Sequence, residues 1–221
     1  MSLLSCKKLL PLDECTGNCK TYTLQGRIYD GTNNVGFSNT AFKLSLEYFR
    51  SNCIFCPKPR NDIYVGTTDV NGNFTILVNL DTTLFNDYSL KLITAEKENY
   101  YNSFSGYLDN SNLNQSNNIR VVFYSTTNLT LKLFRTQNDT FDNLRISHDW
   151  KQINGSGQTT FKEDYFGPIP NRNGDTTINI VTAADIVTMV TVSKYSNGTF
   201  KDLKDSLVCK KGVSNVITAN Y

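Results

Sequence analysis

Four cysteines stand in two close pairs, and their type and spacing could support covalent or metal chemistry. Cys15 and Cys19 precede the first alternating apolar run, and Cys53 and Cys56 follow the second. Because consecutive antiparallel strands run in opposite directions, the start of one and the end of the next lie at the same end of a sheet. We therefore expect the four sulfurs to converge. They could form disulfides that bridge Cys53 and Cys56 back to Cys15 and Cys19, form a zinc site with four thiolate ligands, or remain free thiols.

The other reactive side chains do not form a catalytic set. Cys209 follows Val208 at an expected strand end, where a cysteine is more often a small buried hydrophobe than a nucleophile. His148 is the sole histidine, and alternation puts it on the same strand face as Trp150, an expected core residue. No nucleophile motif, phosphate-binding glycine loop or metal-ligand run stands out. The sequence predicts a protein that is not an enzyme and needs no cofactor.

Oxygen-bearing side chains at Asp69, Asn71 and Asn73 could suggest a calcium loop. An EF-hand loop places its glycine at the sixth position and a bidentate glutamate at the twelfth. Here Gly72 falls at the fourth position and Leu80 holds the twelfth. Asparagine and glycine accept the positive φ of a tight reversal, so this stretch predicts a β-hairpin turn rather than a metal site.

Short alternating runs separated by polar turns predict an all-β protein of two β-sandwich domains. The first domain is expected over 20–108, after a tether at 1–19, with a polar linker at 109–118. The second, over 119–221, is expected to be immunoglobulin-like. Its strands are expected at 119–124, 128–134, 143–150, 159–165, 176–181, 185–195, 203–209 and 213–219.

Several short motifs of the first domain resemble the carboxypeptidase regulatory-like, transthyretin-like β-sandwich family. They are Gly26-Arg27-Ile28-Tyr29-Asp30, Ala41-Phe42-Lys43-Leu44, Thr68-Asp69-Val70-Asn71-Gly72-Asn73-Phe74, Tyr88-Ser89-Leu90 and Tyr100-Tyr101. The chain departs from the family where 35–39 replaces a proline-rich approach, and where 51–62 inserts two cysteines. The resemblance implies a sandwich module of secreted and surface proteins, without catalytic residues.

The N-terminal stretch Leu3-Leu4-Ser5-Cys6-Lys7-Lys8 resembles the lipobox of bacterial lipoproteins. That resemblance implies acylation of Cys6 and anchoring in the outer membrane, facing the periplasm or the cell surface. Only five residues precede Cys6, so a disordered tail with a stray cysteine is the alternative. No apolar run reaches the 18 residues of a membrane span. Export would favour disulfides over zinc at the four paired cysteines.

The balance of charges in the composition argues against nucleic acid as a partner. The chain has 22 basic and 20 acidic residues without a long block of one sign, which is unlike a nucleic-acid-binding protein.

An aromatic cluster follows the last strand of the first domain: Tyr100, Tyr101, Phe104 and Tyr107. These rings could stack on sugars, or simply pack in the core and at the edge of the sheet.

These features favour a non-catalytic, lipid-anchored envelope protein that serves in binding, adhesion or assembly. One alternative is a glycan-binding accessory lipoprotein of a polysaccharide-uptake system, which would use the aromatic cluster. Another is a structural spacer in a larger membrane complex. The membrane is the one partner that the sequence indicates, through Cys6, and a protein or glycan partner is left open.

Overall fold

The protein is all-β. The computed structural model describes residues 15, 17–48, 60–102, 107–108, 113, 119–135, 143–153, 159–170 and 175–221, of which 102, 107, 151–153 and 159–170 by their backbone alone. The described residues contain fourteen strands and a short 3-10 turn. Cys6, Cys53, Cys56 and Phe104 lie outside the described residues, as does the side chain of Tyr107.

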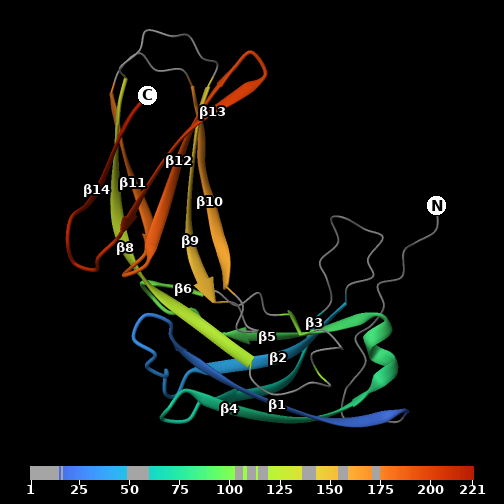
Figure 1. Ribbon diagram of the computed structural model, residues 1–221. Coiled ribbons are helices and arrows are strands. Elements are labelled where there is room, and N and C mark those ends of the chain that lie inside the picture. The colour runs from blue at the N-terminus through green and yellow to red at the C-terminus, as the bar shows by residue number, and fades with distance from the viewer. Residues whose placement is uncertain are drawn as a thin grey trace, which may run out of the picture. The chain divides into compact units, whose positions relative to one another are not determined.

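The strands gather in two compact units (Figure 1). Unit 1 comprises Met1–Tyr29, Val35–Ala95 and Phe104–Val121, and unit 2 comprises Asp30–Asn34, Glu96–Ser103 and Val122–Tyr221. Two short segments expected in the first domain, 30–34 and 96–103, thus belong to unit 2. One is held by a hydrogen bond from the Gly31 N–H to the Phe123 carbonyl. The other contains β6 (Tyr100–Asn102), which pairs with β8 (Ile119–Phe134).

Unit 1 contains two groups of paired strands. Its strands are β1 (Cys19–Asp30), β2 (Ala41–Tyr48), β3 (Arg60–Thr67), β4 (Asn73–Asp81), β5 (Tyr88–Thr94) and β7 (Tyr107–Leu108). Strand β1 pairs antiparallel with β4, and the other four form a sheet in the order β3-β2-β5-β7. Alternate residues of β4 are buried, and the rings of Phe74 from β4 and Phe42 from β2 lie 4.9 Å apart. The two groups therefore share one apolar core, as a sandwich requires.

The hairpin before β4 forms as the sequence predicts. Gly72 has a φ of 80°, and Asp69 accepts hydrogen bonds at one carboxylate oxygen from the N–H groups of Asn71 and Asn73, each 2.8 Å long. The N–H of Asn73, followed by its side chain and the Asn71 N–H, lowers the pKa of Asp69. The carboxylate of Asp69 therefore fixes the turn.

Unit 2 also has two sheets around an apolar core. Its other strands are β9 (Asn143–Ile153), β10 (Thr159–Pro170), β11 (Thr176–Ala183), β12 (Val187–Ser196), β13 (Thr199–Val208) and β14 (Asn215–Asn220). One sheet has the order β10-β9-β12-β13. In the other, β8 pairs antiparallel with β11 and parallel with β14. The buried core includes Leu129, Leu131 and Leu133 of β8, with Val190 and Val192 of β12.

Strand β8 is continuous, although the sequence predicts two strands separated by Ser125, Thr126 and Thr127. The structure keeps these polar residues in the strand because both neighbours pair with them. Ser125 lies opposite Tyr100 of β6, and Thr126 lies opposite Ala183 of β11. The Ser125 carbonyl also accepts a hydrogen bond from the Ala184 N–H. Cross-strand pairing outweighs the low apolar content of this stretch.

Candidate functional site

The structure joins Cys15 to Cys19 in a disulfide, with their Cα atoms 5.8 Å apart. The expectation that these two cysteines bridge to Cys53 and Cys56 is therefore corrected, although their participation in a disulfide is confirmed. Three residues lie between the two cysteines, so the chain closes locally within the ordinary Cα span of a disulfide. The bond closes a short loop at the start of β1. It also removes both thiolates from any zinc site.

Tyr100 and Tyr101 are half-buried and pack inside unit 2. The Tyr101 hydroxyl donates a 2.9 Å hydrogen bond to the Val181 carbonyl, and its ring lies 4.8 Å from that of Trp150. The Tyr100 ring lies edge-on to Phe123, with 6.5 Å between centroids. Both rings therefore help to hold β6 in place. They are not laid out as an open row on which a sugar would stack.

The two residues considered for histidine or thiol chemistry lie in buried positions. His148 stacks on Trp150, with 5.6 Å between ring centroids, and both side chains are buried on one face of β9 as expected. Cys209 is a buried free cysteine, and burial raises the pKa of its thiol. A thiol held protonated is a poor nucleophile. The expectation that Cys209 acts as a small apolar residue agrees with its place in the unit 2 core.

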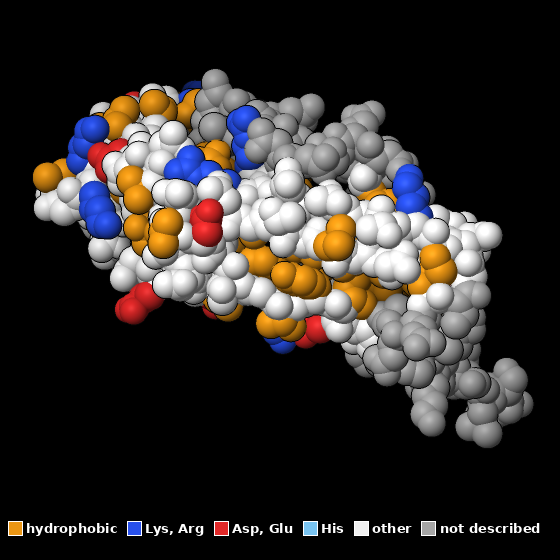
Figure 2. Space-filling model, turned by 90° about the horizontal axis from the view of Figure 1, so that it is seen from below, with side chains coloured by type: hydrophobic (Ala, Val, Ile, Leu, Met, Phe, Trp, Pro, Cys, Tyr) orange, Lys and Arg blue, Asp and Glu red, His pale blue; other side chains and the backbone are white. Residues whose placement is uncertain are grey.

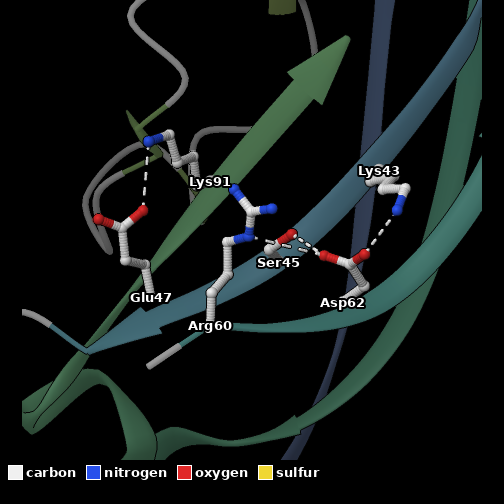
Figure 3. Close-up of polar contacts among 6 residues, drawn as sticks. All are labelled: Lys43, Ser45, Glu47, Arg60, Asp62 and Lys91. Carbon is white, nitrogen blue, oxygen red and sulfur yellow. Dashed lines mark hydrogen bonds and ion pairs between the residues drawn. The ribbon is translucent and has the colours of Figure 1, made fainter. Parts of the chain in front are cut away.

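A row of polar and charged side chains crosses the face of the β3-β2-β5 sheet opposite to its apolar face (Figure 3). It consists of Lys43, Ser45 and Glu47 of β2, Arg60 and Asp62 of β3, and Lys91 of β5. Asp62 accepts hydrogen bonds of 2.8 Å from Lys43 Nζ and 2.6 Å from Ser45 Oγ. Lys91 Nζ lies 3.2 Å from Glu47. These contacts tie three neighbouring strands together.

Asp62 gives this row a pH dependence. The hydrogen bond from Lys43, followed by that from Ser45, lowers its pKa from the ordinary value near 3.8. The ionised Asp62 therefore stabilises the folded state at pH values above the ordinary pKa. This stabilisation is lost as the pH falls through the lower pKa of the folded state. Because the side chain is 32% exposed, we expect Asp62→Asn to lower the free energy of unfolding by about 0.5–1 kcal/mol near neutral pH.

Urea titrations of the wild type and Asp62→Asn at pH about 7 and about 2.5 would measure this difference. The difference between the two proteins should shrink at the lower pH, because protonation removes the charge of Asp62. Glu98→Gln, a change at an exposed position, is the matched control and should have no effect. A difference between wild type and Asp62→Asn that persists at low pH would contradict an electrostatic origin.

Strand β13 is the most exposed of the strands whose side chains the structure describes. It stands last in the order β10-β9-β12-β13, so among the described strands it pairs with β12 alone. All ten of its residues are exposed except Leu203 and Leu207, which are half-buried. The edge carries a charged sequence, Lys201-Asp202-Leu203-Lys204-Asp205. An edge strand offers backbone N–H and C=O groups to another chain, and charges of this kind restrict which chain can pair.

A groove of about 270 Å³ lies between this edge and β14. Its apolar lining consists of Val190 and Val192 from β12, Leu203 from β13, and Ile217 and Ala219 from β14. Lys204, Asp205, Thr218 and Asn220 supply its polar lining. The groove therefore combines an apolar interior, polar groups and an adjacent strand edge. These are the properties of a surface that receives an extended polypeptide.

The described parts of the chain contain no group of three or more side chains placed to hold a metal ion. They also contain no helix long and apolar enough to cross a membrane. On the face shown in Figure 2, basic and acidic side chains are scattered among uncharged surface, and hydrophobic side chains form small groups. The groove and edge of unit 2, rather than a catalytic centre, are the best candidate for contact with another molecule.

The chain matches no protein-family model and no curated protein sequence. Among solved structures it is similar to the D295N variant of the shaft pilin SpaA from Lactobacillus rhamnosus GG, with 10% identity and a TM-score of 0.35 over 91% of this chain and 98% of that chain. It is also similar to the major pilin T-13 of Streptococcus pyogenes, with 15% identity and a TM-score of 0.28 over 93% and 99%. Such low scores carry no information on what this chain binds.

Proposed function

We propose that this protein is an exported, non-catalytic β-sandwich protein that serves in adhesion or assembly at the cell surface. The observation that carries the proposal is the edge of β13 with its neighbouring groove. Strand edges bind other chains through backbone hydrogen bonds, while a groove beside them selects side chains. A protein that presents such a surface on a packed scaffold is suited to holding another protein.

The use of polar side chains supports a structural role. The amide of Asn215 donates hydrogen bonds of 3.0 and 2.9 Å to the carbonyls of Asn128 and Lys210. Its carbonyl oxygen accepts a 2.8 Å hydrogen bond from the Lys210 N–H. The buried hydroxyls of Thr182 and Thr188 lie 2.8 Å apart in the core. These groups satisfy one another inside unit 2, and they stabilise turns and strands instead of facing a substrate.

The disulfide between Cys15 and Cys19 supports export, because such bonds persist in oxidising compartments. Acylation of Cys6 and attachment to the outer membrane belong to the same proposal, and so does a carboxypeptidase regulatory-like identity for unit 1. The packing of Tyr100 and Tyr101 inside unit 2 favours a protein partner over stacked glycans. A role as a spacer in a larger complex is compatible with the same surface.

The anchor is tested by labelling cells with a fatty-acid analogue and following the full gene product and its Cys6→Ala variant. We expect the wild type to take up label and to enter the detergent phase, and the variant to do neither. Protease treatment of intact cells then reports whether the protein faces outward. Absence of label on the wild type would remove the lipid anchor from the proposal. Loss of the gene without effect on attachment or on a surface complex would remove the adhesion and assembly role.

A further inference from the structure

We propose that a second copy of this chain pairs antiparallel with β13, with Leu203 of one copy opposite Leu203 of the other. Two four-stranded sheets would then join edge to edge, in the order β10-β9-β12-β13 followed by the same strands of the second copy in reverse. Such a contact uses the same strand on both molecules, as a two-fold symmetric dimer requires. The inference rests on the proposed function and deepens it, because it names the chain that this edge receives.

The hairpin between β12 and β13 fixes which backbone groups face outward. Its two-residue turn, Asn197 and Gly198, has positive φ at both positions, and Ser196 lies opposite Thr199. In such a hairpin the residues that flank the turn form a hydrogen-bonded pair, and hydrogen-bonded pairs recur at every second residue. Odd-numbered residues of β13 therefore bond to β12. Even-numbered residues, among them Asp202 and Lys204, direct their N–H and C=O groups to the open edge.

This parity restricts how a second β13 can pair. Even-numbered residues must face even-numbered residues if both are to exchange hydrogen bonds. With Leu203 on the two-fold axis, Asp202 of one copy faces Lys204 of the other in a hydrogen-bonded pair. On the opposite side of the sheet, Lys201 then faces Asp205. Each face of the joined sheet therefore carries two ion pairs. All four directly opposed pairs join opposite charges.

The neighbouring registers that keep this parity are unfavourable. Moving the axis to Asp202 or to Lys204 places a like charge directly opposite itself, and moving it to Lys201 or Asp205 does the same. Like charges directly opposed across two strands are destabilising. The sequence Lys201-Asp202-Leu203-Lys204-Asp205 is therefore complementary to itself in one antiparallel register and in none of the adjacent ones.

Leu203 supplies the apolar part of the contact. Leu203 lies opposite Val192 in the β12–β13 ladder, and Asp205 lies opposite Val190. Since Val190 and Val192 are buried, Leu203 and Asp205 are on the inner face of the sheet, beside the groove. A second β13 would bring its own Leu203 to this inner face. There the two half-buried Leu203 side chains would lie directly opposite each other, and each would cover apolar surface of the other.

One local rearrangement accompanies pairing. In the single chain, a carboxylate oxygen of Asp205 accepts a 2.7 Å hydrogen bond from the N–H of Ser206. Ser206 is even-numbered, so this N–H belongs to the open edge. On pairing it would bond to the Phe200 carbonyl of the second copy, and Asp205 would turn to Lys201 of that copy. The Asp205 side chain thus satisfies the outward N–H of Ser206 in the single chain, and the Phe200 carbonyl of a second copy takes its place on pairing.

Sedimentation velocity of the full 221-residue chain over a series of concentrations tests the proposal. We expect an equilibrium between a 24.9 kDa monomer and a dimer of twice that mass, and weaker association at high salt. Asp205→Lys converts two of the four attractive pairs into repulsive ones, so it should weaken the dimer by roughly tenfold or more. The charge swap Lys201→Asp with Asp205→Lys should restore association to near the wild-type value.

Lys132→Glu is the matched control, because Lys132 is exposed on β8, which is paired on both sides. It should leave the dissociation constant unchanged, and circular dichroism would verify that each variant folds. A monomer at every concentration would overturn the proposal and leave the charges as protection against association. It would also be overturned by a dimer that Asp205→Lys leaves intact, or by a charge swap that fails to restore pairing.

Discussion

Replacing Trp150 by alanine should lower the free energy of unfolding of unit 2 by about 3–5 kcal/mol, the range for removing a large aromatic side chain from a core. Trp150 is 1% exposed and is the sole tryptophan of the chain. The centroid of its ring lies 5.6 Å from that of His148 and 4.8 Å from that of Tyr101. Alanine would leave a cavity bounded by residues of β6 and β9. These residues are fixed by strand pairing and can close it only in part.

Trp150→Phe separates packing from hydrogen bonding. The indole nitrogen is buried and has no hydrogen-bond partner among the described residues, so phenylalanine removes no such bond. We expect a loss of about 1–2 kcal/mol for this smaller ring. Val187→Ala is the control at an exposed position of β12, and its effect should stay within about 0.5 kcal/mol.

Urea unfolding followed by far-ultraviolet circular dichroism is the appropriate measurement, because both tryptophan variants lack the fluorescent probe. Fluorescence of the wild type would identify the unit 2 transition. If Trp150→Ala cost no more than Trp150→Phe, the ring would not be filling the core. The placement of β6 against β9 would then need revision.

Local patterns predict most of the fold because they involve residues close in sequence. The period of two in β4 places Phe74, Ile76 and Val78 inside, as expected. Local patterns could not show that β8 continues through Ser125, Thr126 and Thr127, where the sequence predicts a break between two strands. Whether polar residues remain in a strand there depends on pairing with β6 and β11, which come from distant parts of the chain.

The candidate site was less accessible to sequence reasoning. The charges from Lys201 to Asp205 resemble those of any solvent-exposed strand until the sheet order places β13 at an edge. The signal that could have identified them is the order of the charges: each charge before Leu203 has the opposite charge at the same distance after it. This order matters only when an antiparallel neighbour is considered. The cysteine prediction failed for the opposite reason. It assumed a long-range bridge where Cys15 and Cys19 are close enough in sequence to join directly.

Glycine at position 72 should be highly sensitive to substitution. Its φ of 80° already disfavours a side chain, and a Cβ would overlap the Ile28 carbonyl oxygen and lie 2.8 Å from the Gly36 Cα. The obstructing atoms belong to the backbone. They are held by the 2.8 Å hydrogen bond from the Ile28 N–H to the Gly72 carbonyl and by the 2.9 Å bond from the Phe37 N–H to the Ile28 carbonyl.

We therefore expect Gly72→Ala to cost about 3 kcal/mol or more, since overlap with backbone adds to the conformational strain. Gly198→Ala is the matched control, because Gly198 has a φ of 79° and no atom lies within 4 Å of the place that a Cβ would occupy. It should cost about 1 kcal/mol, from strain alone. Urea unfolding of the two variants gives the comparison. Equal losses would mean that the turn moves away from Ile28 and Gly36 at little cost, so that the close approach at Gly72 does not stabilise unit 1.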